Sequence, residues 1–60
     1  MRFVTPQEAA LYTLLAGSPL HIDDIIVKSG LTVGDVSAIL LRLELKGAIM
    51  QLPGKIFAIT

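Results

Sequence analysis

The chain has sixty residues, with five basic and five acidic side chains, one His, no Cys and no Trp. This length and composition exclude several classes of protein. The chain is below the usual size of one domain, and its 53% apolar content is too high for a disordered tail. Without Cys there is no disulfide and no thiolate metal site, so a packed core must stabilise the fold. The formal net charge of zero disfavours a dedicated nucleic-acid binder, which usually carries an excess of basic side chains.

The sequence carries no recognisable membrane or export signal. No apolar run approaches the ~18 to 20 residues of a membrane span. The N-terminus, Met1-Arg2-Phe3-Val4, has no long apolar segment and no small-residue cleavage site. We therefore expect a cytoplasmic protein with no membrane contact. Because the chain begins almost directly on a helix signal and stops on an apolar run, we expect one domain over residues 1–60, excised from the C-terminus of a longer chain.

The first helix is predicted over residues 6–16. Thr5 suits an N-cap, Pro6 the first helical position, and Glu8 completes a capping box three residues after the cap. Gly17-Ser18-Pro19 ends the helix.

The second helix is predicted over residues 22–29. Asp23 and Asp24 at its start and Lys28 near its end complement the helix dipole, and Gly30 stands where a left-handed C-cap is needed.

The third helix is predicted over residues 33–46. Thr32 and Asp35 form a weaker version of the capping box, and Gly47 provides the C-cap with Lys46 in the last turn. Apolar residues spaced four and three apart form its core stripe. The stripe consists of Val36, Leu40 and Leu43.

Three short segments have the pattern of β-strands. Residues 20–22 are long enough for one ladder contact at most, whereas residues 48–52 and 55–60 predict two strands joined by a turn at Pro53-Gly54. Since Pro-Gly favours a type II turn, which fits a tight hairpin poorly, a longer loop with a bulge is an alternative.

This order of elements is typical of a winged helix-turn-helix, a mainly α (α+β) fold with three helices and a short C-terminal β-hairpin wing. The link Ser29-Gly30-Leu31-Thr32 has the required length and Gly, and Leu31 supplies an apolar plug between two helices. The third helix is the one that such a fold offers to a DNA major groove. A three-helix bundle with a frayed apolar tail is the structural alternative.

The most distinctive segments are Pro-Leu-His-Ile-Asp at 19–23, Leu-Glu-Leu-Lys-Gly at 43–47 and Gln-Leu-Pro-Gly at 51–54. Together with Ser29-Gly30-Leu31 and Val36-Ser37-Ala38, they resemble the C-terminal winged-helix domain of the DprA/Smf DNA-processing family over residues 19–57. The resemblance implies a role in natural transformation and DNA recombination, in which DprA protects incoming single-stranded DNA and helps to load the RecA recombinase. It also implies that the main DNA-binding surface lies on a Rossmann-like domain, which this chain does not contain.

The candidate DNA contacts are few. They are Arg42, Lys46 and Lys55, with Ser37 as a hydrogen-bond donor. Arg42 and Lys55 stand where a winged helix places phosphate contacts, and two such contacts correspond to a salt slope of about −2, hence to weak non-specific binding to single- or double-stranded DNA. The resemblance thins at Met50, where relatives are expected to carry a basic residue.

Sequence-specific readout is disfavoured by the third helix itself. Its early exposed positions are expected to be Val33, Gly34, Ser37, Ala38 and Leu41, none of which has a side chain that reads base edges bidentately. A transcription-factor-type reader is therefore the least favoured function.

Apolar residues are left over outside the predicted core. Leu41 and Leu45 form an i, i+4 pair outside the core stripe, with Ile39 expected on its flank. In the wing, Ala48, Met50 and Leu52 are expected to share one face. The predicted partner interface therefore consists of Leu41, Leu45, Met50 and Leu52, since contiguous apolar surface usually marks a binding site.

The sequence contains no recognisable catalytic or metal site. His21 beside Asp23 and Asp24 is interpreted as part of a helix cap, and one imidazole without Cys does not make a transition-metal site. We expect no cofactor, no bound metal and no enzymatic activity.

Two functions follow as hypotheses. The first is an interaction module of a DNA-processing protein, contacting the parent chain's Rossmann-like domain, a recombination partner or a second copy in a homodimer. The alternative is an auxiliary DNA-binding winged helix that contacts phosphates through the third helix and the wing.

Overall fold

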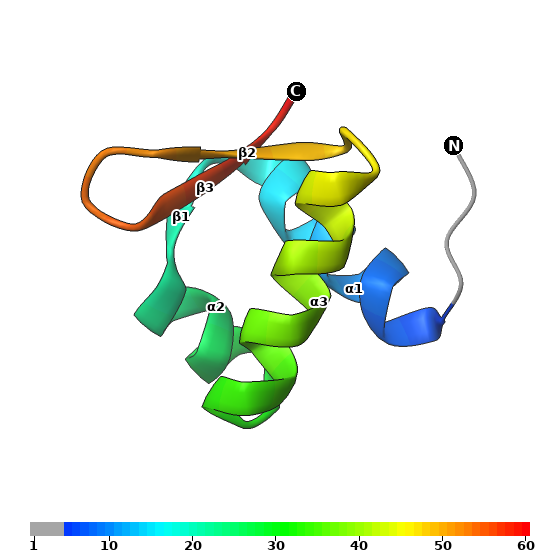
Figure 1. The fold of residues 1–60 in the computed structure, drawn as a ribbon. Coiled ribbons are helices and arrows are strands. Elements are labelled where there is room, and N and C mark those ends of the chain that lie inside the picture. Colours follow the sequence, from blue (N-terminus) through cyan, green and yellow to red (C-terminus); the bar gives the residue numbers. More distant parts are fainter. Residues whose placement is uncertain (1–4) are drawn as a thin grey trace.

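Three helices and a small antiparallel sheet make up residues 5–60, the part of the chain that the computed structural model describes. The predicted absence of a signal peptide concerns residues 1–4, outside this range. In chain order the elements are α1 (Pro6–Gly17), β1 (Leu20–His21), α2 (Ile22–Ser29), α3 (Val33–Leu45), β2 (Ile49–Leu52) and β3 (Ile56–Ile59) (Figure 1). The predicted winged helix is thus confirmed, and the frayed-tail bundle is wrong because residues 49–59 form two paired strands.

Each helix begins at a side chain that accepts a backbone hydrogen bond. Thr5 Oγ1 accepts from the Glu8 amide at 3.2 Å, and Thr32 Oγ1 accepts from the Asp35 amide at 3.1 Å. His21 caps α2, with Nδ1 accepting from the Asp23 amide at 3.0 Å. These contacts satisfy N–H groups that have no partner inside a helix, and they set the starts where the sequence predicted them.

The end of α3 reverses the chain into the sheet through Gly47, whose φ is +75°. The Gly47 amide donates to the Glu44 carbonyl at 2.9 Å, and the Ala48 amide donates to the Leu43 carbonyl at 3.0 Å. This pair of bonds is a Schellman motif, which requires a left-handed residue. The turn directs Ala48 inward, where it is 1% exposed, so the prediction that Ala48 shares an exposed face with Met50 is wrong.

The sheet has the strand order β1-β3-β2, with β3 in the centre (Figure 1). Two residue pairs, Leu20↔Phe57 and His21↔Ile56, join β1 to β3, more than the single contact expected from the sequence. The Ile22 amide also donates to the Lys55 carbonyl at 3.0 Å. The wing is therefore held to the helices on one side instead of projecting as a free hairpin.

The wing turn is the longer of the two alternatives. Because Leu52 pairs with Ile56, the loop holds the three residues Pro53, Gly54 and Lys55. Gly54 and Lys55 have φ values of +85° and +60°, so two successive residues are left-handed. For a non-glycine residue such as Lys55, this conformation costs about 1–2 kcal/mol.

The core lies between the helices and the inner face of the sheet. It includes Ile39, which is 2% exposed and packs inward, so its predicted position on the flank of α3 is wrong. Ile39 and Leu43 lie four residues apart on α3 and thus on the same side of the helix, which widens the buried stripe. The fully or nearly buried apolar side chains are Leu11, Leu15, Ile25, Val36, Ile39, Leu40, Leu43, Ala48, Ile49 and Phe57.

We predict that Gly47→Ala lowers the free energy of unfolding by about 1 kcal/mol, because a Cβ disfavours the left-handed backbone. A Cβ at Gly47 would meet nothing within 4 Å, so backbone strain and not a clash causes the loss. Gly17→Ala is the matched control, since Gly17 also faces open space but lies in the last turn of α1 without positive φ. Urea unfolding should show Gly17→Ala neutral or stabilising; equal losses in both variants would contradict the account.

Candidate interaction surface

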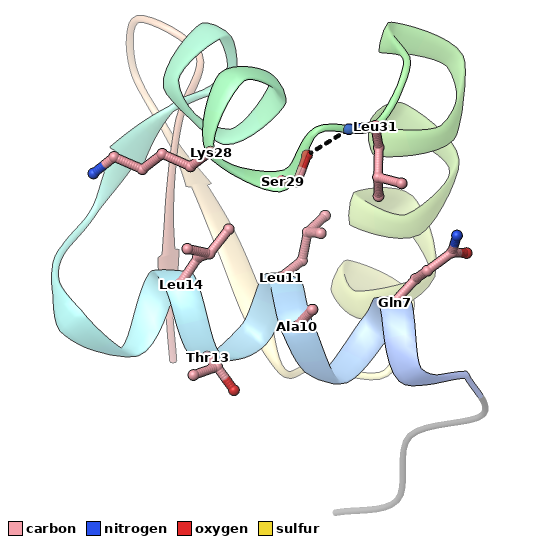
Figure 2. A pocket seen from close by; sticks show the side chains of 8 residues that line it. All are labelled: Gln7, Ala10, Leu11, Thr13, Leu14, Lys28, Ser29 and Leu31. Atoms are coloured by element: carbon pink, nitrogen blue, oxygen red, sulfur yellow. Dashed lines mark hydrogen bonds between the residues drawn. The ribbon is translucent and has the colours of Figure 1, made fainter.

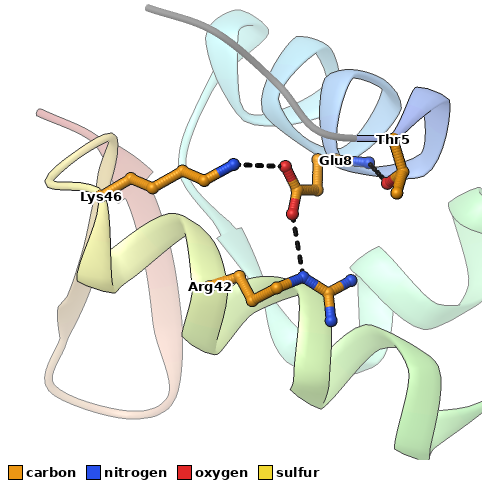
Figure 3. Close-up of polar contacts among 4 residues, drawn as sticks. All are labelled: Thr5, Glu8, Arg42 and Lys46. Atoms are coloured by element: carbon orange, nitrogen blue, oxygen red, sulfur yellow. Dashed lines mark hydrogen bonds and ion pairs between the residues drawn. The ribbon is translucent and has the colours of Figure 1, made fainter.

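A buried carboxylate joins the first turn of α1 to the last turns of α3. Glu8 is 0% exposed, and it is the one charged side chain found buried among residues 5–60. Arg42 Nε donates to Glu8 Oε2 at 2.8 Å, and Lys46 Nζ donates to Glu8 Oε1 at 2.6 Å (Figure 3). Each carboxylate oxygen therefore has its own cation. We call this arrangement the Glu8 clamp.

The Glu8 clamp contributes more to the relative position of α1 and α3 than to the net free energy of folding. Removing a carboxylate from water costs several kcal/mol, which the cations offset only when they are well placed. The side chains of Arg42 and Lys46 keep 47% and 28% of their surface exposed, so they carry less of this cost. The clamp thus fixes the position of α1 against α3 and occupies two of the chain's five basic side chains.

Sequence reasoning assigned Glu8 to a capping box and missed its tertiary role. Its amide does bond the cap residue Thr5, as predicted. Its carboxylate, however, contacts Arg42 and Lys46, which follow Glu8 by 34 and 38 positions in the chain. A signal was present in α3, because Arg42 and Lys46 are like charges at i, i+4, which destabilise a helix unless an anion lies near. Only the packing of α1 could show which anion it was.

The structure does not bring the predicted DNA contacts together. Arg42 and Lys46 lie on the flank of α3 that faces α1, in the Glu8 clamp. Ser37 and Lys55 instead line a hollow of about 450 Å³ between α2, α3 and the wing, which Asp23 also borders. Ser37 is 140° or more around the helix from the two clamp cations, at 100° per residue. No described face therefore gathers all four residues.

The outward face of α3 is apolar or small over its whole length. Gly34, Ala38, Leu41 and Leu45 are all exposed, with Leu41 at 57% and Leu45 at 79%. Their spacing of four, three and four places them on one side of the helix, opposite the core stripe. We call this row the α3 seam. Two of the four predicted partner residues belong to it.

The other two predicted partner residues lie on the outer face of the sheet. Met50 pairs with Ala58 and Leu52 pairs with Ile56, so these four side chains share one face. Met50 is 45% exposed, and the other three are half-buried. The apolar outer row expected in the wing is therefore present with Met50 and Leu52 but without the buried Ala48. Sequence reasoning did not single out Val27 of α2, which is 80% exposed.

One comparison with known proteins assigns a family. The family model described as the DprA winged helix domain matches residues 4–55. Comparison with curated proteins and with solved structures gives no match. The chain belongs to the DprA winged helix domain family. The resemblance noted in the sequence is thereby confirmed, and it extends over α1 as well as the segments that suggested it.

The DprA winged-helix domain also has a shallow apolar groove between α1 and the turn before α3. Its volume is about 410 Å³. Leu11 and Leu14 rise from α1 and Leu31 descends toward them, while Lys28 and Gln7 point away at its ends (Figure 2). The predicted plug role of Leu31 agrees with its packing against the core.

The described residues of the DprA winged-helix domain offer no group of three or more His, Asp or Glu side chains that could hold a metal ion. His21 has the predicted cap role, and its Nδ1 is occupied by the Asp23 amide. Among residues 5–60, no helix is long and apolar enough to cross a membrane. The absence of enzymatic activity stays a prediction.

We predict an asymmetry between the two sides of the Glu8 clamp. The double variant Arg42→Met/Lys46→Met leaves a buried carboxylate without these cations and should lower the free energy of unfolding by about 3 kcal/mol or more. Glu8→Gln should cost less, because the remaining cations reach water. Lys55→Met, which removes an exposed cation, is the control and should change little. Chemical denaturation measures all three, and a Glu8→Gln loss equal to that of the double variant would contradict this reading.

Proposed function

We propose that this DprA winged-helix domain is an accessory interaction module of a DNA-processing protein of natural transformation and recombination. In this proposal it contacts protein through apolar surface and touches DNA at most weakly. The observation that carries the proposal is the α3 seam, because the helix face that a winged helix offers to a DNA groove is here Gly34, Ala38, Leu41 and Leu45.

The distribution of charge supports a protein partner over DNA. Non-specific DNA affinity comes from cations that displace counterions along the backbone. Arg42 and Lys46 are already paired with Glu8, and the hollow that Lys55 lines is also bordered by the carboxylate residue Asp23. The α3 seam offers no side chain that reads a base edge. Exposed leucines in a row instead favour a packed protein contact.

The family adds the biological setting. A DprA winged helix domain implies a parent chain that processes DNA through a Rossmann-like domain. The partner of the apolar surface is then that domain, a recombination protein, or a second copy of this chain. We place the protein in the cytoplasm, where incoming single-stranded DNA is processed during natural transformation.

The alternative, an auxiliary phosphate-binding winged helix, is supported by one observation. Ser37 and Lys55 line the same hollow between α3 and the wing, which is where a DNA backbone would pass in this fold. One exposed cation there corresponds to a salt slope of about −1 and therefore to very weak binding.

Fluorescence anisotropy with single- and double-stranded oligonucleotides at low salt decides between the two. We expect no saturation below about 100 µM protein, since Lys55 is the one cation that lines the hollow between α3 and the wing in residues 5–60, and one phosphate contact contributes little affinity. Micromolar binding that weakens in Lys55→Gly would instead support the alternative. This variant removes the cation while relieving the left-handed backbone at φ +60°, so a loss of binding would not reflect unfolding.

A further inference from the structure

The α3 seam has the spacing of a coiled-coil interface. Gly34, Ala38, Leu41 and Leu45 are separated by four, three and four residues, as are successive a and d positions of a heptad. All four are exposed, and the core stripe of α3 lies on the opposite side. One helix thus carries two apolar stripes, of which the fold itself covers one.

The sizes of the seam residues select a particular occupant. The N-terminal half presents Gly34 and Ala38, and the C-terminal half presents Leu41 and Leu45. A second α3 running antiparallel would place its Leu45 opposite Gly34 and its Leu41 opposite Ala38. Every layer would then hold one large and one small side chain, which fills the space evenly. A parallel α3 would stack leucine on leucine and leave a gap between the glycines.

The charges beside the seam fit the same partner. Asp35 and Arg42 lie on one flank of α3, seven residues and nearly two turns apart. In an antiparallel two-fold pair this flank meets itself in reverse, so Asp35 of each copy comes within about 3 Å of Arg42 of the other along the helix axis. Arg42 donates its Nε to Glu8, and the guanidinium carries four further N–H donors. Two reciprocal ion pairs would therefore border the seam without dismantling the Glu8 clamp.

From this complementarity, we infer that the partner of the α3 seam is the antiparallel α3 of a second copy of this chain. The inference rests on the proposed interaction function and names its partner. The pairing covers the helix face that a winged helix offers to DNA, so self-association and groove binding exclude each other. The contact runs for about 20 Å along one helix, so it buries less area than a standard protein–protein interface. We therefore expect weak association, with a dissociation constant near about 100 µM.

Cysteine trapping tests the orientation in a chain that has no Cys of its own. Gly34→Cys and Leu45→Cys proteins are mixed in a thiol–disulfide buffer, and the cross-linked species are identified by mass. Antiparallel pairing should favour the mixed disulfide over the two homodimers about fivefold beyond the statistical ratio, because only facing positions satisfy disulfide geometry. Val27→Cys replaces Gly34→Cys in the control, since Val27 is 80% exposed but lies on α2.

Sedimentation equilibrium tests the association itself. The unmodified chain should pass from monomer toward dimer as its concentration rises to about 1 mM. Leu41→Glu brings two carboxylates together near the two-fold axis and should weaken the dimer at least tenfold, whereas Val27→Glu should leave it unchanged. Circular dichroism confirms that both variants stay folded, as expected for exposed positions.

The outcomes separate this inference from the proposed function. A chain that remains monomeric at about 1 mM, or Gly34→Cys cross-links that form homodimers at or above the statistical ratio, would overturn antiparallel self-pairing. Neither result would show DNA binding, so the proposed interaction function would stand with another partner. Micromolar DNA binding together with clean monomers would overturn both.

Discussion

The ion pairs of the Glu8 carboxylate, buried at the start of α1, with Arg42 of α3 and with Lys46 at the C-cap of α3 are the interactions on which the placement of α1 against α3 depends. A buried carboxylate tolerates few alternative positions, because each displacement from its cations exposes an uncompensated charge to an apolar interior. The clamp therefore adds specificity to a core that is small, as the core of any 60-residue domain must be.

The same interaction explains why zero net charge and a DNA-processing family are compatible. In a winged helix that reads DNA, the cations of the third helix face outward toward phosphates. Here Arg42 of α3 and Lys46, the C-cap of α3, turn toward α1 and neutralise a carboxylate of the same chain. The outward face of α3 is left to small and aliphatic residues.

Both faces of the small sheet carry apolar side chains. Central β3 is paired on both sides, and its inner face contributes Phe57 to the core. Its outer face joins Met50 and Leu52 of β2 in a second apolar surface. With so few residues, the domain cannot cover both faces of its sheet and both sides of α3. Contact with another protein would remove this surface from water and add to a thin margin of stability.

Sequence alone determined the three helices, their caps, the wing and the family. These features rest on local signals that act within a few residues, such as Thr at an N-cap or Gly at a left-handed C-cap. The α3 seam was visible in part, since Leu41 and Leu45 fall outside the core stripe by spacing alone. Tertiary structure alone decided the partners of Glu8, the inward positions of Ile39 and Ala48, and the second strand pairing of β1. The partners of Glu8 and the pairing of β1 depend on contacts between segments distant in the chain, which no local pattern reveals. Ile39 and Ala48 follow from helix spacing and from the turn at Gly47, but their burial shows only once the sheet and α1 pack against them.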